Sequence, residues 1–348
     1  MKALVRFNHK QKKINIIDIE KPFLEKNCNT HAIIKVSYSG ICGRDIEHYN
    51  SKLDKKKIPY VMGHEFSGVI IEINKNKKKL KKNDRVVCET VVSVCEKCSS
   101  CLSGYYNLCP KRKNIGSGNT GSFAKYIKVP IKYIHKITNK ISLKEAALIE
   151  PMAVCYNALI KNTEIKKNEN LIIFGSGTIG LICLKIAKMR GSNVTLITTR
   201  NDVIQSKIAK SDGVEKIFYY DKDKLYMHEI LQFYNNRNVD CVIDTVGGSD
   251  ETISAALELV RPGGKIVKLG WFMKKNINAN LDLLIRKNIN LVGSFSHNNK
   301  IWKNCIAILD KKKISLNNLI TKVDYLHNWK KHFVILQKRR AVKVLLTP

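Results

Sequence analysis

No run of apolar residues in the 348-residue sequence approaches the roughly 18 that a membrane-spanning helix requires. The first residues, MKALVRFNHKQKK, also lack the apolar core of a signal peptide. Internal repeats and low-complexity linkers are absent as well. The lack of a membrane-spanning run argues against a membrane protein, and the lack of a signal-peptide core argues against a secreted one. We therefore expect the chain to reside in the cytoplasm.

Acidic residues are scarce: 29 Asp and Glu face 62 Lys and Arg, which gives a net charge of +33. An excess of this size first suggests a nucleic-acid-binding protein. The lysines, however, are spread along the chain, as in Lys77–Lys79, Lys81–Lys82 and Lys311–Lys313. A dedicated binder concentrates them on one element, with aromatic residues between them. We therefore expect no nucleic-acid partner and a surface charge that has no function of its own. The alternative is a positive field that helps to collect a phosphorylated substrate or cofactor.

The remaining composition is ordinary for a globular protein. Hydrophobic residues make up 44% and charged residues 26% of the chain, so neither disorder nor a fibrous protein is expected. A length of 348 residues also exceeds the roughly 100–200 residues of a typical domain. The sequence therefore predicts two domains.

Residues 154–295 alternate short apolar runs with helical patterns, which predicts a doubly wound α/β domain around a parallel sheet. The predicted strands are Leu171–Phe174, Val194–Thr198, Lys216–Tyr219, Cys241–Asp244, Ile266–Leu269 and Ile289–Gly293. The predicted helices include Ile179–Met189, Asp202–Lys210 and Glu251–Val260. This domain has the pattern of a nucleotide-binding fold.

Residues 1–153 contain shorter alternating runs, such as Ala32–Tyr38, Gly68–Ile73 and Arg85–Cys88, with Gly and Pro between them. This pattern predicts an antiparallel, barrel-like β domain. Residues 296–348 add a helical stretch near Ile301–Leu309 and the apolar ending AVKVLLTP, a candidate strand that returns to the first domain. We expect residues 296–348 to complete that first domain.

Eleven cysteines fall into two kinds. Four of them share one short segment, CEKCSSCLSGYYNLC: Cys95, Cys98, Cys101 and Cys109. Cytosolic thiols are kept reduced, so such a dense cluster points to a metal rather than to disulfides. Four thiolates close the tetrahedral shell of a structural zinc. The other cysteines, Cys42 excepted, stand alone, and we expect most of them to be small buried side chains.

A second set of candidate metal ligands lies in GICGRDIEHY and GHEFSG, which offer Cys42, His64 and Glu65 from two expected loops. Glu150 follows in ALIEP, where Pro151 is expected to break the pattern and to present the carboxylate at the domain junction. The spacing alone leaves another interpretation open. A lone His beside a Glu is more often a surface pair or a satisfied core residue than a ligand.

The segment IIFGSGTIG follows a predicted strand and opens a predicted helix, which makes it a dinucleotide-binding fingerprint of the Rossmann type. Gly175 and Gly177 would allow a tight turn and a close approach of the backbone, and Gly180 would let the helix pack on the strand. The helix N-terminus would hold the pyrophosphate. The predicted cofactor contacts here are Gly175, Ser176, Gly177, Thr178, Ile179 and Gly180.

The end of the next strand, LITTRND, bears on the choice of cofactor. Enzymes that use NAD place an acidic residue here, about 20 positions beyond the glycines, to bind the ribose. This chain instead has Thr198 and Thr199, followed by Arg200, which offer hydroxyl groups and a cation to a 2′-phosphate. We therefore predict NADP(H) over NAD(H). The alternative places Asp202 on the ribose, although this residue is better placed to cap the following helix.

The motifs GICGRD, GHEFSG, the cysteine segment, LIEPMAV and GSGTIG stand in the order found in the zinc-dependent medium-chain dehydrogenases. The sequence resembles this family over nearly its whole length. It is most similar to the polyol and threonine dehydrogenase branch, since Glu150 stands where alcohol dehydrogenases carry Cys. The resemblance implies a GroES-like catalytic domain, a structural zinc on the cysteine segment, a catalytic zinc, and a homodimer or homotetramer. The implied catalytic ligands are Cys42, His64 and either Glu65 or Glu150 with water.

Two departures from the family pattern follow Cys42. Relatives carry Ser or Thr two residues later, where the hydroxyl passes a proton outward, but Arg44 stands here. The polyol and threonine branch places His five residues later, where this chain has Glu47, with His48 next. Glu47 and His48 are candidate proton shuttles, or else an exposed pair on the surface. Facing the pocket, the guanidinium of Arg44 would hold a carboxylate or phosphate of the substrate.

The resulting prediction is an oxidoreductase in which zinc polarises a substrate oxygen while hydride passes between the substrate and NADP(H). The expected substrate is a secondary alcohol or ketone, namely a polyol, sugar or cyclitol derivative, phosphorylated ones included. The alternatives are an amino-alcohol dehydrogenase of the threonine type and, outside enzymes, a basic nucleic-acid-binding protein on a dehydrogenase fold. Expected pocket walls are Tyr49, residues 119–121 and Phe295–His297.

Overall fold

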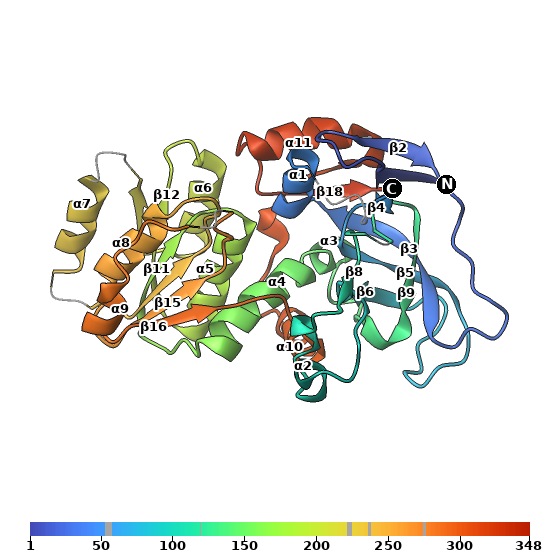
Figure 1. The fold of residues 1–348 in the computed structure, drawn as a ribbon, viewed down its shortest axis with the longest axis horizontal. Helices are drawn as coiled ribbons and strands as arrows, with labels where there is room; N and C mark the ends of the chain where they lie inside the picture. The colour runs from blue at the N-terminus through green and yellow to red at the C-terminus, as the bar shows by residue number, and fades with distance from the viewer. Residues whose placement is uncertain (53–57, 119, 221–224, 236–237, 274–275) are drawn as a thin grey trace. The chain divides into compact units, whose positions relative to one another are not determined.

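The computed structural model describes residues 1–348 except 53–57, 119, 221–224, 236–237 and 274–275. The chain forms two compact units (Figure 1). Unit 1 comprises Met1–Glu150 and His297–Pro348, and unit 2 comprises Pro151–Ser296. Among the described residues, no helix combines the length and the apolar character needed to cross a bilayer.

Unit 2 is built on a six-stranded sheet with the strand order β13-β12-β11-β14-β15-β16. Its strands are β11 (Asn170–Phe174), β12 (Asn193–Thr198), β13 (Lys216–Tyr219), β14 (Cys241–Asp244), β15 (Lys265–Lys268) and β16 (Asn290–Gly293). Neighbouring strands run parallel, which confirms the predicted doubly wound sheet. The strand order reverses between β11 and β14, and sheets of this kind bind ligands at that point.

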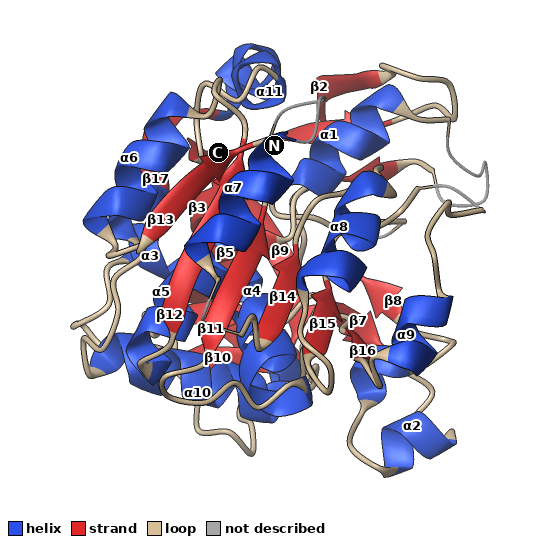
Figure 2. Cartoon of the chain, turned by 90° about the vertical axis from the view of Figure 1, so that its left-hand side faces the viewer, coloured by secondary structure: helices blue, strands red, loops and turns tan. Residues whose placement is uncertain are grey.

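Helices connect the strands of unit 2 as crossovers. They are α5 (Thr178–Arg190), α6 (Val203–Ser211), α7 (Leu225–Phe233), α8 (Glu251–Leu259) and α9 (Asp282–Arg286). Figure 2 shows α7 and α8 in front of the strands, and both helices contact the sheet. The core on this side joins Phe174 and Val242 of the strands to Ile230 and Ile253 of the helices.

Unit 1 contains a larger sheet with the order β10-β6-β5-β3-β18-β17, and β9 also pairs with β3. Its strands are β3 (His31–Gly40), β5 (Glu65–Ile73), β6 (Arg85–Cys88), β9 (Tyr126–Pro130), β10 (Ile134–Lys136), β17 (Ile320–Tyr325) and β18 (Lys343–Thr347). Smaller sheets join β1 (Lys2–Arg6), β2 (Ile14–Asp18) and β4 (Tyr60–Val61), and β7 (Val91–Ser93) with β8 (Lys113–Asn114).

The pairings in unit 1 are antiparallel, as predicted, except that β17 and β18 run parallel. This exception has a physical reason, because α11 (Trp329–Gln337) crosses between the two strands, and a crossover of that kind allows parallel pairing. The predicted return of the chain ending is confirmed, since β18 pairs with β3 through Leu345 and Gly40. The strand β18 (Lys343–Thr347), close to the end of the chain, therefore belongs to the larger sheet of unit 1.

The other helices of unit 1 carry or support the site. They are α1 (Gly43–Asn50), α2 (Ser99–Leu102), α3 (Leu143–Ala146) and α10 (Asn299–Asp310), with the 3-10 turns η2 (Tyr106–Leu108), η3 (Ile131–Tyr133), η5 (Asn317–Leu319) and η6 (Leu326–Asn328). The helix α4 (Ile149–Tyr156) leads from unit 1 into unit 2 and continues as a π-helical segment, η4 (Asn157–Asn162).

Candidate functional site

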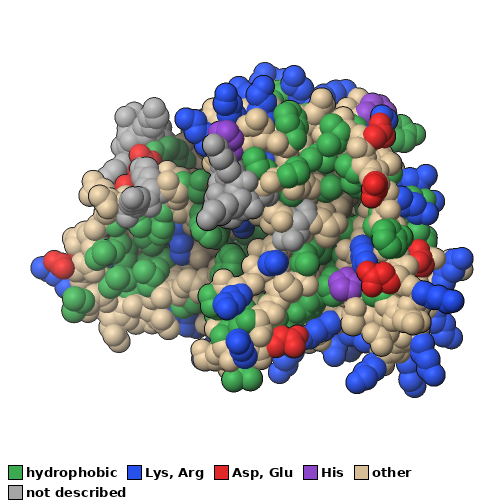
Figure 3. Space-filling model, turned by 45° about the vertical axis from the view of Figure 1, so that its right-hand side comes forward, with side chains coloured by type: hydrophobic (Ala, Val, Ile, Leu, Met, Phe, Trp, Pro, Cys, Tyr) green, Lys and Arg blue, Asp and Glu red, His purple; other side chains and the backbone are tan. Residues whose placement is uncertain are grey.

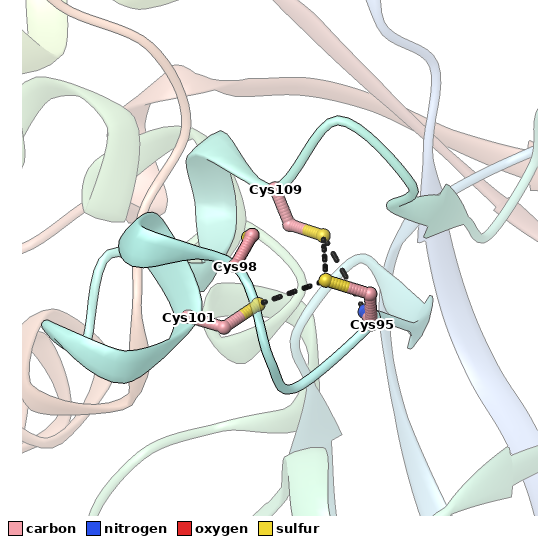
Figure 4. Close-up of side chains that lie close together, drawn as sticks. All are labelled: Cys95, Cys98, Cys101 and Cys109. Atoms are coloured by element: carbon pink, nitrogen blue, oxygen red, sulfur yellow. Dashed lines mark hydrogen bonds between the residues drawn. The ribbon is translucent and has the colours of Figure 1, made fainter.

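The four clustered cysteines lie on the segment between β7 and β8, and Figure 4 shows their side chains gathered at one place. Their sulfur atoms all lie within 4.8 Å of one another. The sulfur of Cys95 is 3.6 Å from that of Cys109 and 4.0 Å from that of Cys101. Four sulfurs around a tetrahedral zinc, at the usual Zn–S distance of about 2.3 Å, stand about 3.8 Å apart. The cluster therefore fits a closed zinc shell.

The local backbone favours a thiolate in this segment. Backbone N–H groups of Lys97 and Cys98, together with neighbouring thiols, lower the pKa of Cys95 to about 6. Zinc binds the thiolate form of cysteine. The N–H groups directed at this sulfur therefore support the same metal site as the sulfur spacing does.

Cys42, His64 and Glu65 form a second cluster, in which their ligand atoms lie within 4.8 Å of one another. Two of them lie in loops, as expected: Cys42 immediately precedes α1 and His64 immediately precedes β5, whereas Glu65 is the first residue of β5. Gly63 makes the turn into β5 at a φ of +85°, which favours glycine. A thiol, an imidazole and a carboxylate are the ligand types of a catalytic zinc, and three of them leave a fourth position open.

Asp45, on the first turn of α1, supports this second cluster. Its Oδ2 accepts a hydrogen bond from the backbone N–H of Cys42 at 2.9 Å, and its Oδ1 lies 3.8 Å from Nδ1 of His64. Burial raises the pKa of Asp45, and the nearby His64 opposes that shift. A carboxylate beside Nδ1 leaves Nε2 of the imidazole for a metal. Sequence analysis missed Asp45, although a carboxylate three residues after a candidate ligand is a visible signal.

Glu65 is paired with a lysine near the end of the chain. Nζ of Lys343 lies 2.6 Å from Oε2 of Glu65 and donates to the carbonyl oxygen of Ile41 at 3.0 Å. Both charged side chains are 2% exposed. Burial alone would lower the pKa of Lys343, but Glu65 and then Cys42 raise it above its ordinary value. A charged Lys343 therefore balances Glu65 inside the site.

The carboxylate of Glu150 stands outside the cluster of three ligand atoms. Glu150 lies in the first turn of α4, and Pro151 does not break the pattern there, because its missing N–H is not needed in a first turn. Oε1 of Glu150 is 3.1 Å from Nε2 of His297. Burial alone would raise the pKa of Glu150, but the hydrogen bond from His297, and then the proximity of His297 and His64, lower it. Glu150 is thus hydrogen-bonded to His297 and lies close enough to His64 for the two side chains to interact electrostatically.

The candidate proton shuttles Glu47 and His48 lie on α1 together with Arg44, but their surroundings differ. Arg44 and Glu47 are exposed. His48 is buried, and its Nδ1 lies 2.9 Å from the hydroxyl oxygen of Tyr60. The alternative of an exposed Glu47 and His48 pair is therefore wrong for His48. Burial raises the pKa of Tyr60, so its hydroxyl keeps its proton.

The expected pocket walls belong to both units of the chain. Tyr49 packs edge-on against Trp329 and Phe333 beside the core of unit 1, so it is a packing residue. Residue 119 lies outside the described residues. Phe295 belongs to unit 2, where it is 40% exposed and contacts Trp271 edge-on.

The glycine fingerprint connects β11 to α5. Gly175 has a φ of +93°, and a Cβ on Gly180 would stand 1.9 Å from the carbonyl oxygen of Gly175. A Cβ on Gly177, at the start of α5, would have no described atom within 4 Å. The turn and the close packing therefore have the geometry that the motif predicts. Space is left in front of the helix N-terminus, where a pyrophosphate binds in folds of this type.

The carboxyl end of β12 carries the residues that the sequence assigns to the cofactor ribose. The hydroxyl groups of Thr198 and Thr199 donate to Oδ2 of Asp202 at 2.6 and 2.9 Å. Asp202 is the N-cap residue of α6, as expected, and its carbonyl oxygen accepts from the N–H of Ser206, but its carboxylate makes no capping bond to that helix. Arg200 is exposed, and its guanidinium lies 5.2 Å from the ring centre of Tyr219. Arg200 thus leaves its charge at the surface beside β12.

Comparison with known proteins identifies relatives along the whole chain. An alcohol dehydrogenase GroES-like domain matches residues 29–139, and a zinc-binding dehydrogenase model matches residues 178–311. Sorbitol dehydrogenase of Halalkalibacterium halodurans is 33% identical over 100% of this chain and 99% of its own length. D-arabitol-phosphate dehydrogenase of Enterococcus avium is 34% identical over 90% and 89%. Galactitol-1-phosphate dehydrogenase of Escherichia coli has a TM-score of 0.88 at 25% identity, covering 100% of both chains.

Proposed function

Because this chain belongs to the zinc-dependent medium-chain dehydrogenase family, we propose that it transfers a hydride between NADP(H) and a polyol, sugar or cyclitol. The reacting group would be a secondary alcohol or ketone. The observation that carries the proposal is the cluster of Cys42, His64 and Glu65, whose ligand atoms lie within 4.8 Å of one another. The same chain has a dinucleotide fingerprint between β11 and α5.

In this proposal Cys42, His64 and Glu65 hold the catalytic zinc. Zinc bound there would supply a Lewis acid for the substrate oxygen. Asp45 orients the site, because it binds the backbone of Cys42 and faces Nδ1 of His64. Lys343 supplies a positive charge 2.6 Å from the carboxylate of Glu65, so that this buried carboxylate is paired.

The cysteine cluster has a different role in the proposal. Four thiolates complete the shell of a zinc ion and leave no position for substrate. We assign a structural zinc to Cys95, Cys98, Cys101 and Cys109. The metal would fix the segment between β7 and β8, since the affinity for zinc contributes directly to local folding.

The substrate class can be narrowed to anionic polyols. Two similar proteins are named for sugar-alcohol phosphates, D-arabitol phosphate and galactitol 1-phosphate. Arg44 is exposed at the start of α1, two residues from Cys42. Lys and Arg side chains are also spread over the face that Figure 3 shows. We infer that Arg44 binds a phosphate on the substrate.

NADP(H) is the proposed cofactor. Arg200 is exposed directly after β12 and stacks over Tyr219, which holds a guanidinium where a 2′-phosphate would bind. Thr199 lies beside it and is partly exposed. The buried carboxylate of Asp202 is occupied by the two threonine hydroxyls rather than offered to a ribose.

A homodimer or homotetramer in the cytoplasm completes the proposal. β16 is the edge strand of the sheet in unit 2, and Leu291 on it is 45% exposed. Leu281 and Ile285, at α9, are 58% and 82% exposed. An unpaired edge strand with apolar neighbours pairs readily with a second copy. Zinc ligation requires reduced thiols, which the cytoplasm maintains. Light scattering of the purified protein measures the assembly.

A substrate and cofactor screen tests the proposal. Polyols, polyol phosphates and amino alcohols are offered with NADP⁺ and NAD⁺, and the corresponding ketones with the reduced cofactors. We expect turnover of a polyol phosphate with NADP⁺, and Arg44→Ser should raise KM for that substrate without raising KM for a neutral polyol. Turnover of amino alcohols alone would contradict the substrate class. A higher kcat/KM with NADH than with NADPH would contradict the cofactor assignment.

A further inference from the structure

A chain of hydrogen-bonded side chains ends on Glu150 inside unit 1. Nε1 of Trp302 donates to Nδ1 of His297 at 2.7 Å, and Nε2 of His297 lies 3.1 Å from Oε1 of Glu150. His297 is 0% and Trp302 1% exposed. His297 lies just before α10, and Trp302 lies at the end of its first turn, so one short segment of the chain supplies both side chains.

Trp302 decides which ring nitrogen of His297 carries the hydrogen. An indole N–H only donates, so Nδ1 of His297 must accept. The ring hydrogen is then on Nε2, which faces Glu150. His297 therefore presents a fixed donor to the carboxylate, in the way that a carboxylate or carbonyl fixes the tautomer of a metal-binding histidine.

Trp302 is itself held in place. Its ring stacks on His135, with ring centres 5.5 Å apart and planes 12° apart. Nε2 of His135 lies 2.8 Å from Oε1 of Glu89, and the hydroxyl of Tyr106 donates to Oε2 of Glu89 at 2.5 Å. Tyr106 begins η2 in the cysteine segment. The segment that would hold the structural zinc thus packs against the side chains that orient His297.

The position of Glu150 affects the electrostatics of the cluster formed by Cys42, His64 and Glu65. Its charge is the smallest of the causes that raise the pKa of Cys42, after burial, Glu65 and Asp45. His64 in turn is one of the groups near enough to lower the pKa of Glu150, after the larger effect of His297. The carboxylate is therefore in electrostatic range of two candidate metal ligands, and a change in its orientation changes the field at the site.

We propose that His297 is a positioning residue, which holds the carboxylate of Glu150 beside the metal site in one orientation through a hydrogen that Trp302 fixes on Nε2. The inference rests on the proposed zinc enzyme. It assigns roles to two residues that are far from the reacting motifs in sequence. His297 acts through Glu150 and does not touch the metal ligands in this scheme.

Four variants test this role. Trp302→Phe removes the indole N–H and keeps an aromatic ring on His135. His297→Phe removes the donor to Glu150, and His297→Gln keeps an amide N–H in its place. Cys305→Ala is the matched control, because Cys305 is equally buried on α10 but lies outside the hydrogen-bonded chain.

The first readout is the visible absorption of the protein with Co²⁺ in both metal sites. The spectrum of Cys42→Ser, loaded at the cysteine cluster alone, is subtracted to isolate the catalytic site. We expect the difference spectrum to change in Trp302→Phe and His297→Phe, to return toward that of the wild type in His297→Gln, and to stay unchanged in Cys305→Ala. In a Glu150→Ala background, Trp302→Phe should add no further change.

The second readout is kinetic. Loss of an outer hydrogen bond at a metal site typically costs about 10-fold to 100-fold in activity or metal affinity. We expect kcat of the zinc enzyme to fall at least about tenfold in His297→Phe, with the Kd for NADPH unchanged. Wild-type spectra and kcat in both Trp302→Phe and His297→Phe would overturn the positioning role and leave the enzyme assignment intact. A wild-type protein that binds no Co²⁺ at Cys42 would overturn both.

Discussion

Lys343 and Glu65 form an ion pair across 278 residues of sequence, with 2.6 Å between Nζ and Oε2. Both side chains are 2% exposed. Removal of one partner leaves the other charge buried and uncompensated, which typically costs about 3–5 kcal/mol. We expect Lys343→Met to lower the free energy of unfolding of the zinc-free protein by about this amount. Adding Glu65→Gln should recover part of the loss. Urea unfolding measures both, and an unchanged stability in Lys343→Met would contradict the pairing.

Gly40 leaves the space that the carboxylate of Glu65 occupies. A Cβ at Gly40 would stand 2.4 Å from Oε2 of Glu65, whereas a Cβ at Gly43 would meet no described atom within 4 Å. We expect Gly40→Ala to displace Glu65 and to reduce the zinc held at Cys42, while Gly43→Ala keeps the wild-type content. Metal analysis after gel filtration compares the two variants. Equal zinc in both would show that Glu65 is not needed where the structure places it.

Asp202 sets a negative charge behind the residues proposed to bind the cofactor ribose. Its carboxylate accepts hydrogen bonds from Thr198 and Thr199. The negative charge of the carboxylate repels a 2′-phosphate more than it repels a 2′-hydroxyl. Asparagine would keep a hydrogen-bonding oxygen and remove that charge. We expect Asp202→Asn to raise the ratio of kcat/KM for NADPH over NADH by about tenfold. Arg200→Ala should move the same ratio in the opposite direction. A ratio that neither variant changes would place the ribose elsewhere.

The lowered pKa of Asp324 predicts that this residue stabilises the fold in a pH-dependent way. Hydrogen bonds from Asn328, from His332 and from the backbone N–H of Tyr325 lower its pKa. A carboxyl group with a lower pKa in the folded chain stabilises the fold above its unfolded pKa of about 3.9, and this contribution is lost as the pH falls below that value.

The matching variant is Asp324→Asn. Its Tm should lie a few degrees below that of the wild type at pH 7, and the difference should shrink as the pH falls below about 4. Asp18→Asn is the control, because the pair of Asp18 with Lys2 is 71% exposed on both sides and such pairs add little stability. A Tm difference for Asp324→Asn that stays constant down to pH 3 would contradict the lowered pKa.

The parts of the fold that sequence analysis predicted are those with local signals. Apolar runs bounded by turns gave the six strands of unit 2, with Lys216–Tyr219 and Cys241–Asp244 at their observed bounds. The glycine fingerprint and the cysteine segment are equally local, because their residues act within one turn or one loop. Short apolar runs that contain β-branched or aromatic residues and are bounded by turns favour buried strands.

The parts that sequence analysis missed depend on contacts between distant residues. Lys343 stood in a predicted strand, but its pairing with Glu65 follows only from the register of β18 beside β3. His48 was expected to be exposed as one alternative, yet Tyr60 covers it. His297 was expected as a pocket wall, and its contact with Glu150 spans 147 residues. Periodicity does not report which strands become neighbours, so such pairs need the structure.

Zinc content measured together with hydride transfer tests the central claim most directly. Elemental analysis of the purified protein should give two zinc ions per chain, and Cys42→Ser should give one zinc ion and no NADPH-dependent turnover. Cys42→Ser protein that still holds two zinc ions, or that still turns over substrate at the wild-type rate, would contradict a catalytic zinc at Cys42, His64 and Glu65.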